Sequence, residues 1–166
     1  KDTTMVDKYL YNNAGTITEK VATVTSTGAS DAGKIIALDA SGKLDQSFMP
    51  TGIGADTASI IASEALSAGD LVNIWDSSGS FKVRKADATS VGKEAHGFVK
   101  ASVSNGASAT IYFEGSNDAV SGLSPGKQFL STTPGLTTST APTGSGNVIQ
   151  VVGFASSSTS LNFQSR

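Results

Sequence analysis

The sequence predicts an all-β fold: a small β-barrel or β-sandwich that carries an extended N-terminal arm. Short runs of β-branched and aromatic residues recur between Gly, Ser, Asn and Asp, at the spacing typical of such folds. The 25 Ser and 18 Thr outnumber the 26 charged residues, and small hydroxyl residues suit pleated strands and tight turns. The apolar alternation is confined to the later two thirds of the chain, so only that part is expected to build a core.

The chain of 166 residues is long enough for one domain and an appendage. We therefore divide it into an arm, residues 1–56, and a β domain, residues 57–166. The arm is too poor in apolar residues to fold alone, and we expect it to order against another subunit or a larger assembly. Its apolar anchors are expected to be Tyr9, Leu10, Tyr11, Ile35, Leu38, Phe48 and Met49.

Within the arm, β-branched residues predict a strand over 16–25, after a turn at Asn12-Asn13-Ala14-Gly15. A short apolar strand is expected at 34–38. Residues 44–49 suit one helical turn, which Pro50 would end. Residues 51–54 read as a flexible joint.

The first half of the β domain contains two hairpin signals. Asp76-Ser77-Ser78-Gly79 separates the strands expected at 71–75 and 81–84, and Asn105-Gly106 separates those expected at 97–103 and 108–114. In the last of these strands Ala109, Ile111 and Phe113 alternate with polar residues, which indicates a half-buried strand. The remaining candidate before them is 57–66, with a strand at 60–62 or a short helix.

The second half is predicted to contain strands at 128–131, 148–155 and 160–163, after a type II turn at Pro125-Gly126. Residues 148–155 are apolar at consecutive positions, so we expect this strand at the centre of the sheet with both faces buried. Residues 132–146 are rich in Thr, Ser, Pro and Gly and read as a surface loop.

Composition excludes several function classes. The net charge is −2, the isoelectric point is about 5.2, and no basic run is present, so nucleic-acid binding is not expected. With no cysteine there is no disulfide and no thiolate metal site. No apolar stretch approaches the ~20 residues that span a bilayer, and the first residues lack the apolar segment of a signal peptide. We expect no association with a membrane, and we expect synthesis in a cytoplasm.

Motifs that resemble catalytic or binding sites each lack a necessary part. The segment 28–35 ends in Lys34-Ile35, where a phosphate-binding loop needs Ser or Thr after the Lys. The segment 39–50 has Pro50 where a calcium loop needs a bidentate Glu. No sequence motif places a nucleophile near His96, so it is not expected to act as a general base. Asn117-Asp118 is interpreted as a solvated turn. We therefore predict no enzymatic activity, no catalytic residue, no cofactor and no metal site.

Trp75 lies at the end of a predicted strand, just before a turn. Such a residue is either a lid on the core or an anchor in an interface. Both interpretations stay open at this point, and Trp75 is retained as an interface candidate.

Several phrases of the sequence resemble virion proteins of tailed bacteriophages. Residues 31–45 and 49–56 look like linker segments common in those proteins, and Ser67-Ala-Gly-Asp-Leu-Val-Asn-Ile74, Gly92-Lys-Glu-Ala-His-Gly-Phe-Val99 and Ala109-Thr-Ile-Tyr-Phe-Glu-Gly115 are similar to their small β domains. The resemblance implies a capsid decoration (cement) protein, a homotrimer that binds the major capsid protein on the outer surface of the virion head.

Two alternatives remain open. The phrase in 34–45 also occurs in tail fibres, which allows a tail-fibre or baseplate component, although a fibre shaft would show repeats and none is found. A carbohydrate-binding module would need Trp75, Tyr112 and Phe113 on one face. Tyr112 and Phe113 are adjacent in a predicted strand and therefore point to opposite faces.

Overall fold

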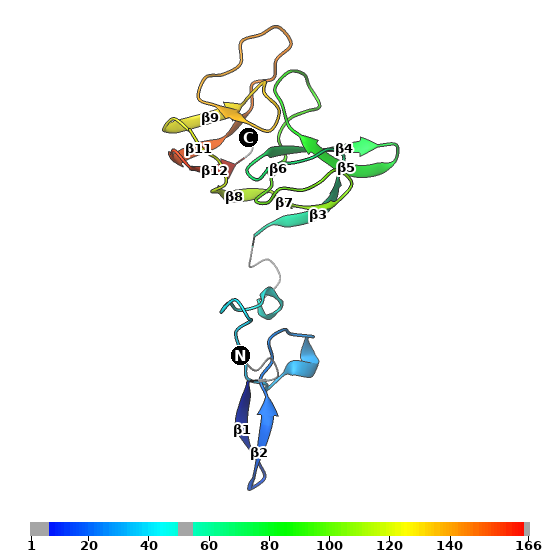
Figure 1. The fold of residues 1–166 in the computed structure, drawn as a ribbon, viewed down its shortest axis with the longest axis vertical. Helices are drawn as coiled ribbons and strands as arrows, with labels where there is room; N and C mark the ends of the chain where they lie inside the picture. Colours follow the sequence, from blue (N-terminus) through cyan, green and yellow to red (C-terminus); the bar gives the residue numbers. More distant parts are fainter. Residues whose placement is uncertain (1–6, 50–54, 165–166) are drawn as a thin grey trace. The chain divides into compact units, whose positions relative to one another are not determined.

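The computed structural model describes residues 7–49 and 55–164. The chain forms two compact units, Lys1–Gly54 and Ala55–Arg166, which we call the N-terminal unit and the β domain (Figure 1). Within the described residues the only helices are two short 3-10 segments, and all other regular structure is β. The prediction of an all-β fold with a barrel is confirmed.

The N-terminal unit begins with a hairpin of β1 (Lys8–Asn13) and β2 (Thr16–Val21). Ala14 and Gly15 form the turn, and both have positive φ, 50° and 96°. A two-residue type I′ turn requires positive φ at both of its central residues. This turn type is favoured in hairpins because its backbone twist matches the twist of the flanking strands. The Asn12 side chain accepts a hydrogen bond of 2.7 Å from the Gly15 N–H.

The rest of this unit is mostly irregular. The strand expected at 16–25 ends at Val21, and the strand expected at 34–38 is wrong: only a single parallel bridge joins Thr23 and Ile36. The chain turns through η1 (Ala29–Asp31) before it reaches residues 34–38, and this segment does not pair continuously with another strand. The expected helical turn is present as η2 (Gln46–Phe48), whose first turn is capped by Asp45.

The β domain contains a closed barrel with the strand order β3-β5-β4-β6-β7. Its strands are β3 (Thr57–Ala62), β4 (Leu71–Ser77), β5 (Ser80–Lys85), β6 (Gly97–Phe98) and β7 (Ser108–Tyr112). Residues 57–62 are therefore strand and not helix. The barrel interior is filled by buried apolar side chains: Ala62, Leu66, Val72, Val83, Val99, Ala109 and Ile111.

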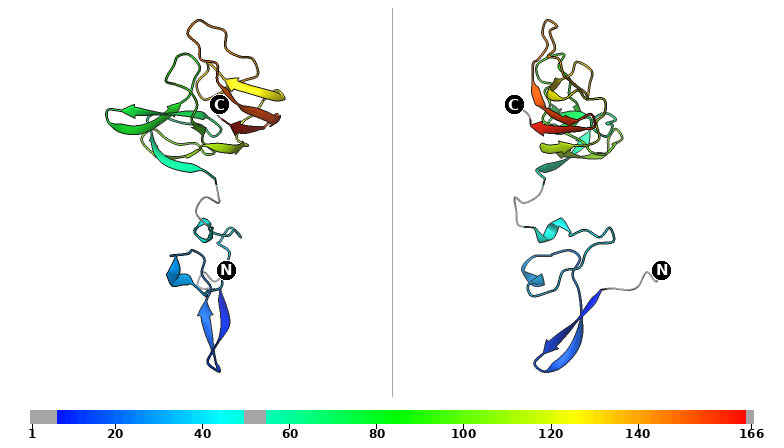
Figure 2. Two further views of the ribbon diagram at one scale, coloured as in Figure 1. Left: turned by 180° about the vertical axis from the view of Figure 1, so that it is seen from behind. Right: turned by 90° about the vertical axis from the view of Figure 1, so that its left-hand side faces the viewer.

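A five-stranded sheet with the order β10-β9-β11-β12-β8 forms the other half of the β domain, and Figure 2 shows it in yellow to red beside the green barrel. Its strands are β8 (Glu114–Asn117), β9 (Gly126–Leu130), β10 (Thr137–Thr138), β11 (Val151–Ser157) and β12 (Ser160–Gln164). The inner face of the sheet packs against the outside of the barrel in a second core: Leu71, Ala86, Ala88, Ala95, Phe98, Leu130, Val152, Leu161 and Phe163.

The two hairpin predictions had different outcomes. The turn between β4 and β5 is present, with positive φ at Ser78 (56°) and Gly79 (82°). Asn105-Gly106 also forms a turn, closed by a 3.0 Å bond from the Ala107 N–H to the Ser104 carbonyl. It does not join two long paired strands, because β6 meets β7 only at Phe98 and Tyr112. Val103 instead bridges to Leu66.

The strand predicted at 148–155 is central in the sheet, as β11 lies between β9 and β12. The prediction that both of its faces are buried is wrong. Val152 is buried in the core between the sheet and the barrel, and Ala155 is also buried. Phe154 is 49% exposed, and Ile149, just before the strand, is 64% exposed. The barrel covers only one face of the sheet, and the apolar side chains on the other face remain accessible.

Candidate functional site

The β1–β2 hairpin presents an apolar face that nothing covers among the described residues. Directly paired residues share a face, so Leu10, Ile17 and Val21 lie together with Lys8 and Glu19. The three apolar side chains are 73%, 61% and 52% exposed. We call this the hairpin apolar face.

The charged pair on this face is well formed but exposed. Lys8 Nζ lies 2.8 Å from Glu19 Oε2. The hydrogen bond with Glu19 raises the pKa of Lys8 and that with Lys8 lowers the pKa of Glu19. Solvent screens such a pair, so it contributes little to stability.

The opposite face of the hairpin is polar and aromatic. Tyr9 and Tyr11 lie here with Lys20 and Thr18, and Lys20 Nζ sits 3.7 Å from the centroid of the Tyr11 ring. This cation–π contact covers part of Tyr11. Tyr9 is half-buried. The strand register therefore places the two tyrosines on one face and their sequence neighbour Leu10 on the other.

The remaining anchors of the N-terminal unit are also accessible. Ile35 (53%), Leu38 (57%) and Met49 (42%) are exposed and Phe48 is half-buried. No residue in 7–49 is buried. Sequence reasoning missed Ile17, Val21, Val24, Ile36 and Leu44, which are exposed apolar residues of the same unit. The turn at Ala14-Gly15 was the available signal for Ile17 and Val21, because it pairs their strand with β1.

Polar contacts, and not a core, hold the loop after the hairpin. Asp31 accepts hydrogen bonds from Lys34 Nζ (2.6 Å), from the Thr27 N–H (2.5 Å) and from the Thr27 hydroxyl (2.8 Å). The Lys34 ammonium and the Thr27 donors lower the pKa of Asp31 to about 2. The segment 28–35 forms a turn around η1, Ala29–Asp31, and lacks the helix that follows the Lys of a phosphate-binding loop. The Asp39 carboxylate caps its own turn through the Ser41 and Lys43 N–H groups, 2.8 Å each.

Trp75 is half-buried on the barrel surface. Its indole Nε1–H donates to the Ser63 hydroxyl at 3.1 Å, and the Arg84 guanidinium lies 4.9 Å from the ring. Trp75 is not among the side chains that pack against either core. Tyr112 packs against the core beside the sheet and Phe113 against the barrel core, so these two aromatic side chains are not presented together with Trp75 as one binding face.

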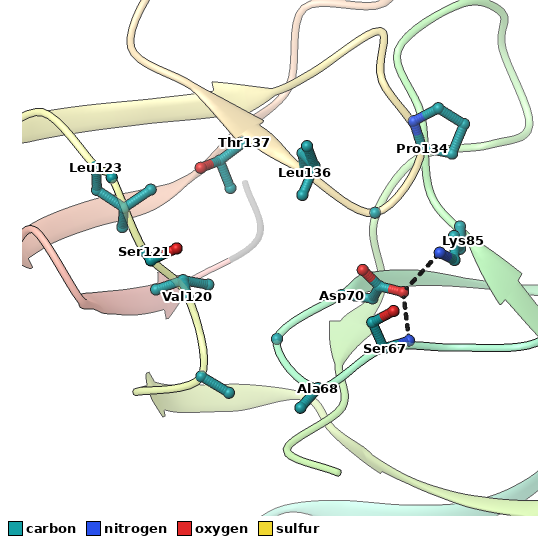
Figure 3. Close-up of a pocket in the computed structure, with 14 residues that line it drawn as sticks. Ser67, Ala68, Asp70, Lys85, Val120, Ser121, Leu123, Pro134, Leu136 and Thr137 are labelled. Atoms are coloured by element: carbon teal, nitrogen blue, oxygen red, sulfur yellow. Dashed lines mark hydrogen bonds and ion pairs between the residues drawn. The ribbon is translucent and has the colours of Figure 1, made fainter. Parts of the chain in front are cut away.

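A pocket of about 470 Å³ in the β domain lies between the β3–β4 loop and the loops at 119–123 and 134–137 (Figure 3). Lys85 Nζ lies 3.1 Å from Asp70 Oδ2, and Asp70 also accepts a 2.7 Å hydrogen bond from the Ser67 N–H. Gly135 packs directly against the Asp70 side chain. The carboxylate and the ammonium are engaged with each other and with the loops, which is a structural role.

His96 and Asn117 are also held by structural contacts. His96 is exposed, and its Nδ1 accepts a 3.0 Å hydrogen bond from the Ile74 N–H. Asn117 is fully buried and donates to the Gly69 carbonyl at 2.9 Å, so the reading of Asn117-Asp118 as a solvated turn is wrong for Asn117. Asp118 accepts bonds of 2.7 Å from Ser160 and Ser116, and these hydroxyls lower the pKa of Asp118.

Across residues 7–49 and 55–164, no group of three or more His, Cys, Asp or Glu residues is placed to hold a metal ion. The same residues contain no helix long and apolar enough to cross a membrane. Comparison of the chain with known protein families, with curated proteins and with solved structures finds no match.

Proposed function

We propose that this chain is a capsid decoration protein that attaches to an assembled virion head through its N-terminal unit and stabilises contacts between capsomers. One observation carries the proposal: the N-terminal unit exposes most of its large apolar side chains and buries none of its described residues. The resemblance of its linker phrases to tailed-phage virion proteins supports the choice of assembly.

A two-stranded hairpin is marginally stable by itself in water. Full burial of one Leu, Ile or Val side chain contributes about 1.5–3 kcal/mol, and the hairpin apolar face offers three such side chains. Contact with the major capsid protein or with a neighbouring copy in a homotrimer would supply that burial. The N-terminal unit would then become ordered where it binds, and binding at many sites would raise the stability of the whole shell.

The test compares virions that lack this protein before and after purified protein is added back. Wild-type protein is expected to bind the particles and to raise the temperature at which they release their genome. The particles without it are expected to assemble normally. An unchanged release temperature combined with lost adsorption to host cells would reject the decoration role and favour a tail-fibre component.

Two matched variants connect the result to the hairpin. Leu10→Asp with Ile17→Asp places two carboxylates on the hairpin apolar face, and we expect at least about tenfold weaker binding to the particles. Thr16→Asp with Thr18→Asp places the same charge on the opposite face and is expected to bind as wild type does. Equal binding by both variants would contradict attachment through the apolar face.

A further inference from the structure

The five-stranded sheet has one face that the barrel does not cover. Pairing across the sheet places Lys127, Phe154, Asn162 and Ser116 in one row on this face, and beside that row lie the pair Phe129 and Val151 and the pair Gln164 and Glu114. We call these residues, with Ile149, the open sheet face.

The centre of the open sheet face is apolar, and there the exposed Phe154 side chain lies beside a hollow in the surface. Phe154 is 49% exposed and Ile149 is 64% exposed. Between them Gly153 carries no side chain, and a hollow of about 280 Å³ opens over it, lined also by Lys127, Val151 and Gln164. An exposed aromatic ring next to a hollow that can receive such a ring makes the surface complementary to a copy of itself.

The charges on the open sheet face are arranged in the same self-complementary way. Lys127 lies on β9 and Glu114 on β8, and β11 and β12 separate them. Among the described residues neither side chain makes an ion pair. A surface with one cation at one flank and one anion at the other attracts a second copy that is turned to bring unlike flanks together.

We propose that the open sheet face is a self-association surface, occupied by the same face of another copy of this chain. Phe154 of each copy fills the hollow over Gly153 of the other, and Lys127 of each copy faces Glu114 of its neighbour. This contact is separate from the hairpin apolar face and does not depend on the virion role proposed above.

The experiment measures the mass of the full chain in solution by sedimentation. Every sample carries Leu10→Asp and Ile17→Asp, so that association through the N-terminal unit does not contribute. In this background the protein is expected to form a dimer, because a reciprocal contact between two identical faces closes with two copies. Phe154→Asp is expected to raise the dissociation constant at least about 30-fold. Phe81→Asp is the matched control, because Phe81 is 79% exposed on the β4–β5 hairpin, and its dissociation constant should be unchanged.

Charge reversal supplies a second, independent measurement. Lys127→Glu and Glu114→Lys are each expected to weaken association about tenfold, and the variant carrying both to recover wild-type association to within about threefold. A rescue within one copy is excluded because two strands lie between the residues. A monomer at every concentration, an assembly unaffected by Phe154→Asp, or a double reversal weaker than either single one would overturn the proposal.

Discussion

Single buried polar residues in this chain join parts of the β domain that are distant in sequence. Asn117 ends β8 in the sheet and donates to the Gly69 carbonyl in the loop that leads into barrel strand β4. Its oxygen accepts a hydrogen bond of 3.3 Å from the Ala119 N–H. A buried amide can fill such a place only when its donors and acceptors are matched, so the identity of the residue is narrowly constrained.

We predict that Asn117→Asp destabilises the β domain by about 1–3 kcal/mol at neutral pH, since the carboxylate cannot donate to the Gly69 carbonyl. Asn105 is exposed in a turn, and Asn105→Asp is expected to change the free energy of unfolding by no more than about 0.5 kcal/mol. Urea unfolding measures both. Acidification toward about pH 4 should recover part of the loss at residue 117, because a protonated carboxyl can donate again. Equal effects at the two positions would show that the buried bond is unimportant.

At the scale of elements, β11 departs from regular pairing at two positions, and its register with β12 shifts between Ala155 and Ser157. Its register with β9 shifts between Val151 and Gly153, and Gly153 has φ of 141°, a conformation that residues with a side chain rarely adopt. A Cβ atom at Gly153 would collide with the Asn162 carbonyl on β12. The bulge therefore depends on glycine both for the backbone angle and for the close approach of β12.

Gly153→Ala is predicted to lower the free energy of unfolding of the β domain by about 3 kcal/mol, from strain and collision together. Gly106→Ala is the comparison, because Gly106 also has positive φ (83°) but has open space around its Cα. That substitution carries strain alone and is expected to cost about 1–2 kcal/mol. Denaturant unfolding of the two variants should rank them in this order, and the reverse order would contradict the account of the bulge.

How far the elements could be predicted depends on the range of the interactions that define them. Ser78-Gly79 and the alternation of Ala109 and Ile111 are local signals, and the structure agrees with both. The division of the chain after Tyr112, where β7 ends in the barrel and β8 begins in the sheet, depends on partners that follow tens of residues later. No local pattern marks that division.

The open sheet face shows a different limit. The sequence signal was real, since 148–155 is apolar at consecutive positions. Its interpretation assumed that both faces are covered within one chain. Consecutive apolar positions in a strand indicate that both faces of the sheet at that strand are shielded from water. One of these faces can be covered by a second copy of the chain instead of by another part of the same chain. The missed candidates, Ile149 and Phe154, belong to this surface.

At the scale of the whole molecule, the two units differ in how they are stabilised. The β domain has two cores of buried residues, and the described part of the N-terminal unit has none. Local opening is easiest where few apolar groups are buried. The N-terminal unit of the free chain should therefore open far more often than the β domain.

Limited trypsin digestion of the free chain is predicted to cleave after Lys20, Lys34 and Lys43 at least about tenfold faster than after any lysine of the β domain. A fragment that contains the intact β domain should accumulate. On virions the same sites are expected to be protected. Cleavage in the free chain that begins at Lys85 or Lys93, with the first 43 residues intact, would show that the N-terminal unit folds independently.

The position of β3 determines how this molecule would carry mechanical load. β3 is the first strand after the N-terminal unit, and it is held on both sides, by β5 in parallel and by β7 in antiparallel register over five residue pairs from Thr57 to Ile61. Tension that enters the β domain at Thr57 loads the β3–β7 ladder first, and the two β3–β5 pairs hold the far end of the strand at Ile61 and Ala62. Because the force runs along the strand axis, these hydrogen bonds are loaded in shear. A protein anchored by its first residues to a pressurised shell would transmit force to its folded domain through this doubly paired strand.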